Sequence, residues 1–130
     1  MAIHIKRIYE AISKNDGYRV LVDRLWPRGI KKEDARIDEW LKDIAPSDSL
    51  RKWFGHQPEK WDAFYARYLD ELFDTAALAH LMELMKKNET LTLLYSAKDE
   101  QHNHAIVIRD FLQVTNDAGA INTKRQNSIY

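Results

Sequence analysis

Short apolar runs at three places along the chain predict β-strands. Ile3, Ile5 and Ile8 alternate with polar residues, which is typical of a half-buried strand. Residues 20–22 (Val-Leu-Val) and 91–95 (Leu-Thr-Leu-Leu-Tyr) are mostly apolar, as in strands that are covered on both faces of a sheet. The pattern therefore predicts a sheet that contains two buried strands.

The connection between the first two strands predicts a hairpin. Residues 15–17 (Asn-Asp-Gly) are a turn signal. The link from Tyr9 to Gly17 is also shorter than the dozen or so residues that a parallel crossover needs. We therefore expect these two strands to pair antiparallel.

Apolar residues three or four positions apart predict the helices. The clearest helical face follows Pro58 and comprises Trp61, Phe64, Tyr65, Tyr68, Leu69, Leu72 and Phe73. A shorter helix over residues 48–54 begins after Ser47 as its N-cap and stops at Gly55. Two further helices are expected over residues 75–87 and from about residue 105 to residue 112.

Three other segments have less regular patterns. Residues 31–35 are polar and predict a single helical turn. Residues 36–45 have helical spacing but are followed directly by Pro46, and the pattern slightly favours helix over strand. Beyond Val114 the sequence becomes polar, which predicts a mobile tail or an arm on a neighbouring surface.

Together these elements predict an α/β fold in one domain. We expect a small mixed, mostly parallel sheet flanked by helices over residues 1–113, and a mobile C-terminal tail over residues 114–130. The chain has 130 residues, of which 45% are hydrophobic and 31% charged. A chain of this size buries enough surface to fold without cross-links.

Composition excludes several classes of function. The 20 basic and 20 acidic residues balance, so net charge does not indicate a nucleic-acid or membrane partner. The chain has 0 Cys, which excludes disulfides, thiolate nucleophiles and cysteine-based zinc sites. No apolar run approaches the roughly 20 residues of a membrane span, and no signal peptide opens the chain, so we expect a cytoplasmic protein. There is no phosphate-binding glycine loop, and no cofactor is expected.

Polar residues directly follow both buried strands. The first group is Asp23, Arg24, Trp26 and Arg28, and the second is Ser96, Lys98, Asp99, His102, Asn103 and His104. If the two strands are parallel, both groups emerge at the carboxyl edge of the sheet, where open α/β sheets bind ligands. The last helix would direct its first free N–H groups to the same place, as anion sites do.

The favoured hypothesis is an anion-binding pocket for a nucleotide or a small phosphorylated or carboxylated molecule. The candidate ligand-binding residues are Arg24, Trp26, Arg28, Lys98, His102 and Asn103. The arginines and the lysine would supply charge, and the tryptophan a stacking wall. No metal site is expected, because two histidines two positions apart do not share a helix face.

If the protein is an enzyme, hydrolysis or group transfer is the leading hypothesis. His104 would act as acid and base, paired with Asp99, because an imidazole moves protons near neutral pH without a cofactor. Asp23 is an alternative general base. The competing structural interpretation is an ion pair between Asp23 and Arg24 at the strand end.

Two alternatives from other classes stay open. A nucleic-acid binding module would use Arg24, Arg28, Arg51 and Lys52 for phosphates and Trp26 and Trp53 for base stacking. The neutral composition counts against it, and packing of the aromatic residues in the core is the simpler interpretation. The other alternative is an interaction domain without a ligand, for example a homodimer formed through exposed aromatic residues or the tail.

Several blocks of the sequence resemble the YeaO-like bacterial proteins of the domain of unknown function 488 group. The blocks are residues 20–29 (VLVDRLWPRG), 40–42 (WLK), 45–47 (APS), 50–56 (LRKWFGH), 93–99 (LLYSAKD) and 102–105 (HNHA). The likeness covers residues 3 to about 112. It implies a small cytoplasmic α/β domain with no assigned reaction.

The resemblance also bears on the chemistry and on one element. A wider branch of the group carries a Cys on its last strand and Cys-His-Arg at the following helix. In this chain Tyr95 stands at the first Cys, and residues 103–105 (Asn-His-Ala) replace the triplet, so only His104 is shared. A thiol mechanism cannot operate here. The resemblance further implies that residues 37–44 form a strand, contrary to the pattern.

Overall fold

The computed structural model describes residues 2–129, with side chains described up to residue 118. Its centre is a sheet of four strands, which are β1 (Ala2–Arg7), β2 (Tyr18–Leu21), β3 (Glu39–Trp40) and β4 (Thr90–Tyr95). The strand order is β1-β4-β2-β3, and every pair is parallel. The predicted α/β fold with a mostly parallel sheet is therefore confirmed.

The predicted hairpin between the first two strands is wrong. β4 lies between β1 and β2 and pairs with both in parallel. Because β2 has only 4 residues, the link must cover a strand length of only about 13 Å. Residues 8–17 can reach roughly 30 Å when extended, so they return along the sheet without a crossover helix. The only helical turn in this link is η1 (Lys14–Asp16).

Residues 2–129 also form five α-helices and two further 3-10 turns. They are α1 (Lys32–Ala35), η2 (Lys42–Ile44), α2 (Asp48–Phe54), η3 (Pro58–Lys60), α3 (Trp61–Phe73), α4 (Ala76–Lys87) and α5 (His104–Ile129). The side chain of Ser47 accepts a hydrogen bond from the Leu50 N–H, and Gly55 ends α2 in the left-handed conformation. Both ends of α2 are therefore as the sequence predicted.

The helix that the pattern favoured over residues 36–45 is wrong. This segment contains β3 and η2 instead, as the family resemblance implied, although the strand is short. Two backbone hydrogen bonds run from Asp38 N to Arg19 O and from Leu41 N to Leu21 O. Pairing with β2 therefore outweighs the local helical spacing.

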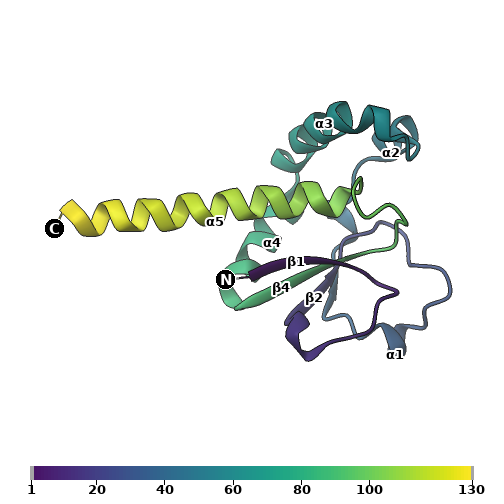
Figure 1. Cartoon of the computed structure of the whole chain (residues 1–130), viewed down its shortest axis with the longest axis horizontal. Helices are drawn as coiled ribbons and strands as arrows, with labels where there is room; N and C mark the ends of the chain where they lie inside the picture. The colour runs from purple at the N-terminus through teal and green to yellow at the C-terminus, as the bar shows by residue number, and fades with distance from the viewer. Residues whose placement is uncertain (1, 130) are drawn as a thin grey trace.

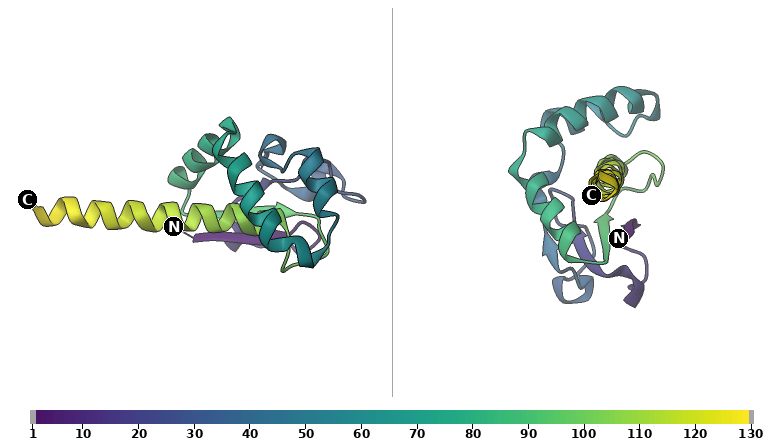
Figure 2. Two further views of the ribbon diagram at one scale, coloured as in Figure 1. Left: turned by 90° about the horizontal axis from the view of Figure 1, so that it is seen from above. Right: turned by 90° about the vertical axis from the view of Figure 1, so that its left-hand side faces the viewer.

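The two faces of the sheet are covered unequally (Figures 1 and 2). The main core lies between one face and helices α2 to α5, while the other face carries a small cluster of Ile8, Leu21, Ala35 and Leu94. Trp26 and Trp40 pack against this small cluster. The carboxyl ends of the strands thus open between a helical layer and a layer of loops.

Helix α5 packs on β1 and on α3, and then projects from the rest of the molecule (Figure 1). It continues to Ile129, through most of the segment 114–130 for which the sequence predicted a mobile tail. Most of that segment lies outside the residues whose side chains are described, so its mobility stays a prediction. Across residues 2–129, no helix combines the length and apolar character of a membrane span.

Candidate functional site

The carboxyl ends of β2 and β4 bring two segments of the chain together. Leu21 pairs with Leu94, and the Val22 N–H donates to the Leu94 carbonyl. The next residues on each segment, Asp23 and Ser96, therefore leave the sheet side by side. This is the common edge that the sequence predicted for the two polar groups.

Asp23 is the centre of this edge. Its Oδ2 accepts hydrogen bonds from Ser96 Oγ at 2.6 Å and from Ser96 N at 3.0 Å. Its Oδ1 lies 3.2 Å from His104 Nε2. Trp40 Nε1 donates to the Asp23 backbone carbonyl at 2.7 Å, which fixes the main chain as well. We call Asp23, Ser96 and His104 the strand-end cluster.

The hydrogen bond of His104 Nε2 to the Val22 carbonyl fixes which ring nitrogen carries a proton. Nε2 lies 3.0 Å from the Val22 carbonyl oxygen, which only accepts, so this nitrogen carries the proton and donates it there. Oδ1 of Asp23 is buried without a hydrogen-bond partner among the described residues, although the imidazole is close. Burial alone would raise the pKa of Asp23, but the contacts with His104 and Ser96 lower it below its ordinary value.

The order of groups in the strand-end cluster differs from that of a hydrolytic triad. In a triad the imidazole stands between the hydroxyl and the carboxylate and takes the hydroxyl proton. Here the carboxylate stands between, and Ser96 Oγ donates to Asp23. A carboxylate with a lowered pKa is a poor base for a hydroxyl. The cluster is suited to holding β2, β4 and α5 together.

The segment before α5 is held by its own side chains. Oδ1 of Asp99 accepts from the backbone N–H groups of Gln101 and His102, and Oδ2 lies 2.9 Å from His102 Nδ1. Asp99 thus lies against His102, and the predicted proton-transfer pair with His104 is replaced by the contact of His104 with Asp23. Asn103 Oδ1 accepts from the Ile106 N–H, so one of the free donors at the start of α5 is already capped.

The cationic and aromatic residues that the sequence assigned to one pocket lie apart from one another at this edge. Arg24 points toward the helical layer, where its Nη2 donates to the Ala45 and Pro46 carbonyls at 3.1 and 3.3 Å. Trp26 packs edge-on against Trp40 at 5.4 Å on the other face, and its indole N–H donates to the Ile30 carbonyl. Its position therefore does not supply a stacking wall beside Arg24. Arg28 and Lys98 are exposed on the surface.

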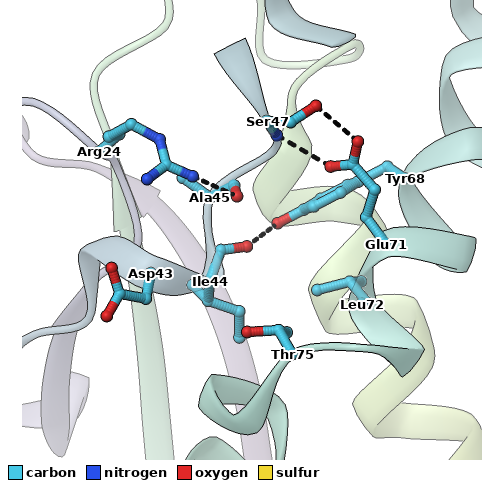
Figure 3. Close-up of a pocket in the computed structure, with 9 residues that line it drawn as sticks. All are labelled: Arg24, Asp43, Ile44, Ala45, Ser47, Tyr68, Glu71, Leu72 and Thr75. Carbon is cyan, nitrogen blue, oxygen red and sulfur yellow. Dashed lines mark hydrogen bonds between the residues drawn. The ribbon is translucent and has the colours of Figure 1, made fainter. Parts of the chain in front are cut away.

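Arg24 lines a pocket of about 160 Å³ between the segment that follows β2, η2 and the α3–α4 junction (Figure 3). The other lining residues are Asp43, Ile44, Ala45, Ser47, Tyr68, Glu71, Leu72 and Thr75. None of these was singled out by the sequence as a site residue. We call this the Arg24 pocket.

The polar groups of the Arg24 pocket are largely engaged with one another. Glu71 accepts from Ser47 N at 2.8 Å and from Ser47 Oγ at 2.6 Å, and the Tyr68 hydroxyl donates to the Ile44 carbonyl at 2.6 Å. These bonds tie α3 to the start of α2 and to η2. The sequence predicted Ser47 as an N-cap and Tyr68 as part of a helix face, but no pattern in it indicated Glu71.

A metal site has no support in the part of the chain whose side chains are described. No group of three or more His, Cys, Asp or Glu residues is placed to hold an ion there. His102 and His104 instead contact Asp99 and Asp23, respectively.

Tyr95 occupies the place where the wider branch of the resembling family carries a Cys. Its side chain is 2% exposed. Burial, together with nearby acidic side chains, raises the pKa of its hydroxyl, and a hydrogen bond with the Asn103 side chain opposes the shift. The strand position that would hold a thiol is therefore filled by a buried phenol.

The chain is similar to a family model and to uncharacterised bacterial proteins. The family model described as "Inactive DUF488-N3 subclade" matches residues 2–130, which confirms the resemblance found in the sequence. The chain is 47% identical to the uncharacterised protein YeaO of Escherichia coli K12 over 113 residues, covering 87% of this chain and 98% of that protein. It is 46% identical to the uncharacterised protein Rv3073c of Mycobacterium tuberculosis over 110 residues, covering 85% and 92%. No solved structure matches.

Proposed function

This chain belongs to the inactive DUF488-N3 subclade, and on that premise we propose that it is a binding protein without catalytic activity. It takes a small ligand through an anionic group, a carboxylate or a phosphate, in the Arg24 pocket. The observation that carries the proposal is the guanidinium of Arg24, which two backbone carbonyls hold at the wall of that pocket.

A guanidinium that is already fixed loses little conformational entropy when a ligand binds. Its planar fork also matches the oxygens of a carboxylate or a phosphate. The protein satisfies the group only in part, because Nη2 is the one guanidinium nitrogen that has a hydrogen-bond partner among the described residues. Nε is buried, so a ligand in the pocket would bind at Nη1. The side chain therefore keeps donor capacity for an added acceptor.

The strand-end cluster supports binding without turnover. The carboxylate of Asp23 accepts a hydrogen bond from the Ser96 hydroxyl, and the His104 N–H is engaged with the Val22 carbonyl. A hydrolase or group-transfer enzyme has less support, because neither contact activates a nucleophile. The description of the family as inactive favours the same conclusion.

A nucleic-acid binding module has less support for a similar reason. Trp53 has the ammonium of Lys60 at 4.9 Å and the guanidinium of Arg67 at 4.2 Å from its ring centre. Trp26 is packed against Trp40. The two rings proposed for base stacking are therefore already in contact with the protein's own side chains.

The binding proposal is tested with acetate and inorganic phosphate as probes. In two-dimensional ¹⁵N NMR titrations, we expect shifts confined to residues 43–47 and 68–75 and to the side-chain N–H of Arg24. Arg24→Gln should abolish them, while Arg51→Gln, a change to an exposed arginine outside the pocket, should leave them unchanged. Equal binding by wild type and Arg24→Gln would overturn the proposal, provided that the variant's NMR spectrum shows a folded chain.

The absence of turnover is tested separately with p-nitrophenyl phosphate and p-nitrophenyl acetate. The protein should release p-nitrophenol no faster than buffer between pH 5 and pH 9. Turnover that disappears in Asp23→Asn would show that the strand-end cluster is catalytic. That result would leave the binding part of the proposal intact.

A further inference from the structure

The groups left unengaged in the Arg24 pocket define the ligand more closely. Glu71 is occupied by both donors of Ser47, and Tyr68 is occupied by the Ile44 carbonyl. What remains for a ligand is the guanidinium of Arg24, the carboxylate of Asp43 and the hydroxyl proton of Thr75, whose oxygen accepts from the Ala77 N–H. One cation and one anion are therefore open to a ligand in the same pocket.

The charges of this pocket disfavour a purely anionic ligand. Arg24 contributes one positive charge, and Asp43 and Glu71 each contribute a negative charge. A phosphate dianion or a simple carboxylate would gain from Arg24 but be repelled by the two carboxylates. A positive group on the same ligand removes this conflict by pairing with Asp43. Figure 3 shows Arg24 and Asp43 on the same side of the Ile44–Ala45 segment.

The size and the apolar part of the pocket limit the rest of the ligand. A volume of about 160 Å³ is below the 300 to 1,000 Å³ that is typical of sites for drug-sized ligands. Ile44, Ala45 and Leu72 provide a short apolar wall beside the charged groups. The space suits a few non-hydrogen atoms with a small apolar substituent.

We infer that the ligand of the Arg24 pocket is a small zwitterion, with its anionic group on Arg24 and its ammonium group on Asp43. The inference rests on the proposed function and narrows it to one class of ligand, of which a short free α-amino acid is the simplest example. Asp43 is exposed, so this pairing is a solvated contact that adds selectivity more than affinity.

The test compares L-alanine with propionate, which lacks the ammonium group, and with ethylamine, which lacks the carboxylate. Inorganic phosphate is added as a purely anionic probe. We expect L-alanine to bind about fivefold more tightly than propionate, the gain of one solvent-exposed ion pair, and ethylamine not to bind measurably. Dissociation constants come from NMR titrations followed at the Arg24 side-chain N–H and at residues 43–47. All probes are used at one pH and one ionic strength.

Asp43→Asn should remove the preference, so that L-alanine and propionate bind within a factor of two of each other. Asp70→Asn is the matched control, because it removes the same charge from an exposed position on α3 next to Glu71 but outside the pocket lining. It should keep the fivefold ratio.

The outcomes separate this inference from the proposed function. If propionate or phosphate binds as tightly as L-alanine and the binding needs Arg24, the anion site stands and the zwitterion inference is overturned. If L-alanine is preferred equally in Asp43→Asn, Asp43 is not the partner of the ammonium and the inference also fails. If no probe binds the folded protein, both proposals fail.

Discussion

Oδ1 of Asp23 lies 3.2 Å from Nε2 of His104, and this contact joins the end of β2 to the first residue of α5. The two side chains are 11% and 15% exposed, so little solvent screens them. Together with Ser96 they connect three segments that are far apart in the sequence. The contact therefore bears on the stability of the whole fold.

Asp23→Asn should lower the free energy of unfolding by about 2–3 kcal/mol, the cost of breaking buried hydrogen bonds to a charged group. The amide has one oxygen acceptor, so its NH2 group would face a donor from either Ser96 or His104. Urea unfolding followed by circular dichroism measures the loss. Asp48→Asn is the control, because Asp48 is 65% exposed and its removal should cost less than about 0.5 kcal/mol. Equal losses in the two variants would contradict the structural role of Asp23.

The stabilisation by Asp23 should disappear in acid. Burial alone would raise the pKa of Asp23. The interactions with His104 and Ser96 outweigh burial and hold this pKa below its ordinary value of 3.8 in the folded protein. As the pH falls, the unfolded chain therefore takes up this proton first, and stability is lost as the pH drops through the folded pKa. The difference in unfolding free energy between wild type and Asp23→Asn should be constant above about pH 5 and shrink below about pH 4.

Subtracting the unfolding free energy of Asp23→Asn from that of wild type isolates the pH dependence due to Asp23. The pKa values of Asp16 and Asp99 are also lowered, but both carboxyls are present in wild type and in the variant. Urea titrations of both proteins at a series of pH values give the difference directly. A difference that stays constant down to pH 2.5 would contradict the lowered pKa of Asp23.

The hydroxyl of Tyr65 should lose its proton at a higher pH than an ordinary tyrosine. Burial, followed by the hydrogen bond of 2.8 Å to Asp110, raises the pKa of Tyr65 to about 12. Asp110→Asn should move this pKa back toward 10, and Arg109→Gln should raise it, because the guanidinium opposes the shift. NMR of ¹³C-labelled tyrosine ring carbons measures each titration. No change in Asp110→Asn would show that the carboxylate is not a cause.

The same shift has a consequence for stability in alkali. Because the folded pKa of Tyr65 is the higher one, the unfolded chain loses this proton first as the pH rises. The contribution to stability is complete below about pH 10 and is lost between there and pH 12. Tyr65→Phe should lack this part of the alkaline loss.

Two glycine substitutions should differ sharply in cost. Gly17 and Gly29 both have positive φ angles, of 64° and 77°. A Cβ at Gly17 would overlap the Thr90 carbonyl oxygen, whereas a Cβ at Gly29 meets nothing within 4 Å. Gly29→Ala should therefore cost about 1 kcal/mol through backbone strain. Gly17→Ala should cost more than about 3 kcal/mol, because strain and steric overlap add. Urea unfolding of both variants decides the matter, and similar costs would contradict the close approach to Thr90.

Much of the local structure was predictable because its causes are local. Ser47 caps α2, Gly55 ends it, and the aromatic face of α3 has the expected spacing. The strand order was not predictable by the same rules. The link between β1 and β2 is short enough for a hairpin, and only the insertion of β4 between them makes the parallel arrangement the better one. That insertion is a contact between distant segments, to which a local pattern is insensitive.

The candidate site, too, was predictable only in part. The rule that parallel strands end at a common edge placed Asp23 near Ser96 and His104. It did not give the direction in which each side chain leaves that edge, so Arg24 and Trp26, two positions apart, were assigned to one pocket although they pack on opposite faces. Glu71 of the Arg24 pocket was missed because a carboxylate on a helix has no special pattern until its tertiary partner is known.

The central position of β4 sets the timing of folding. β1 is made first, yet its only neighbour in the sheet is the strand that is made last. On the ribosome, a nascent chain that stops before residue 90 leaves the backbone donors and acceptors of β1 without a partner strand. The sheet must then close late, after nearly the whole domain has emerged. Such closure between distant ends is slow. Until it happens, β1 has no partner strand on either side, and other chains can pair with it and aggregate.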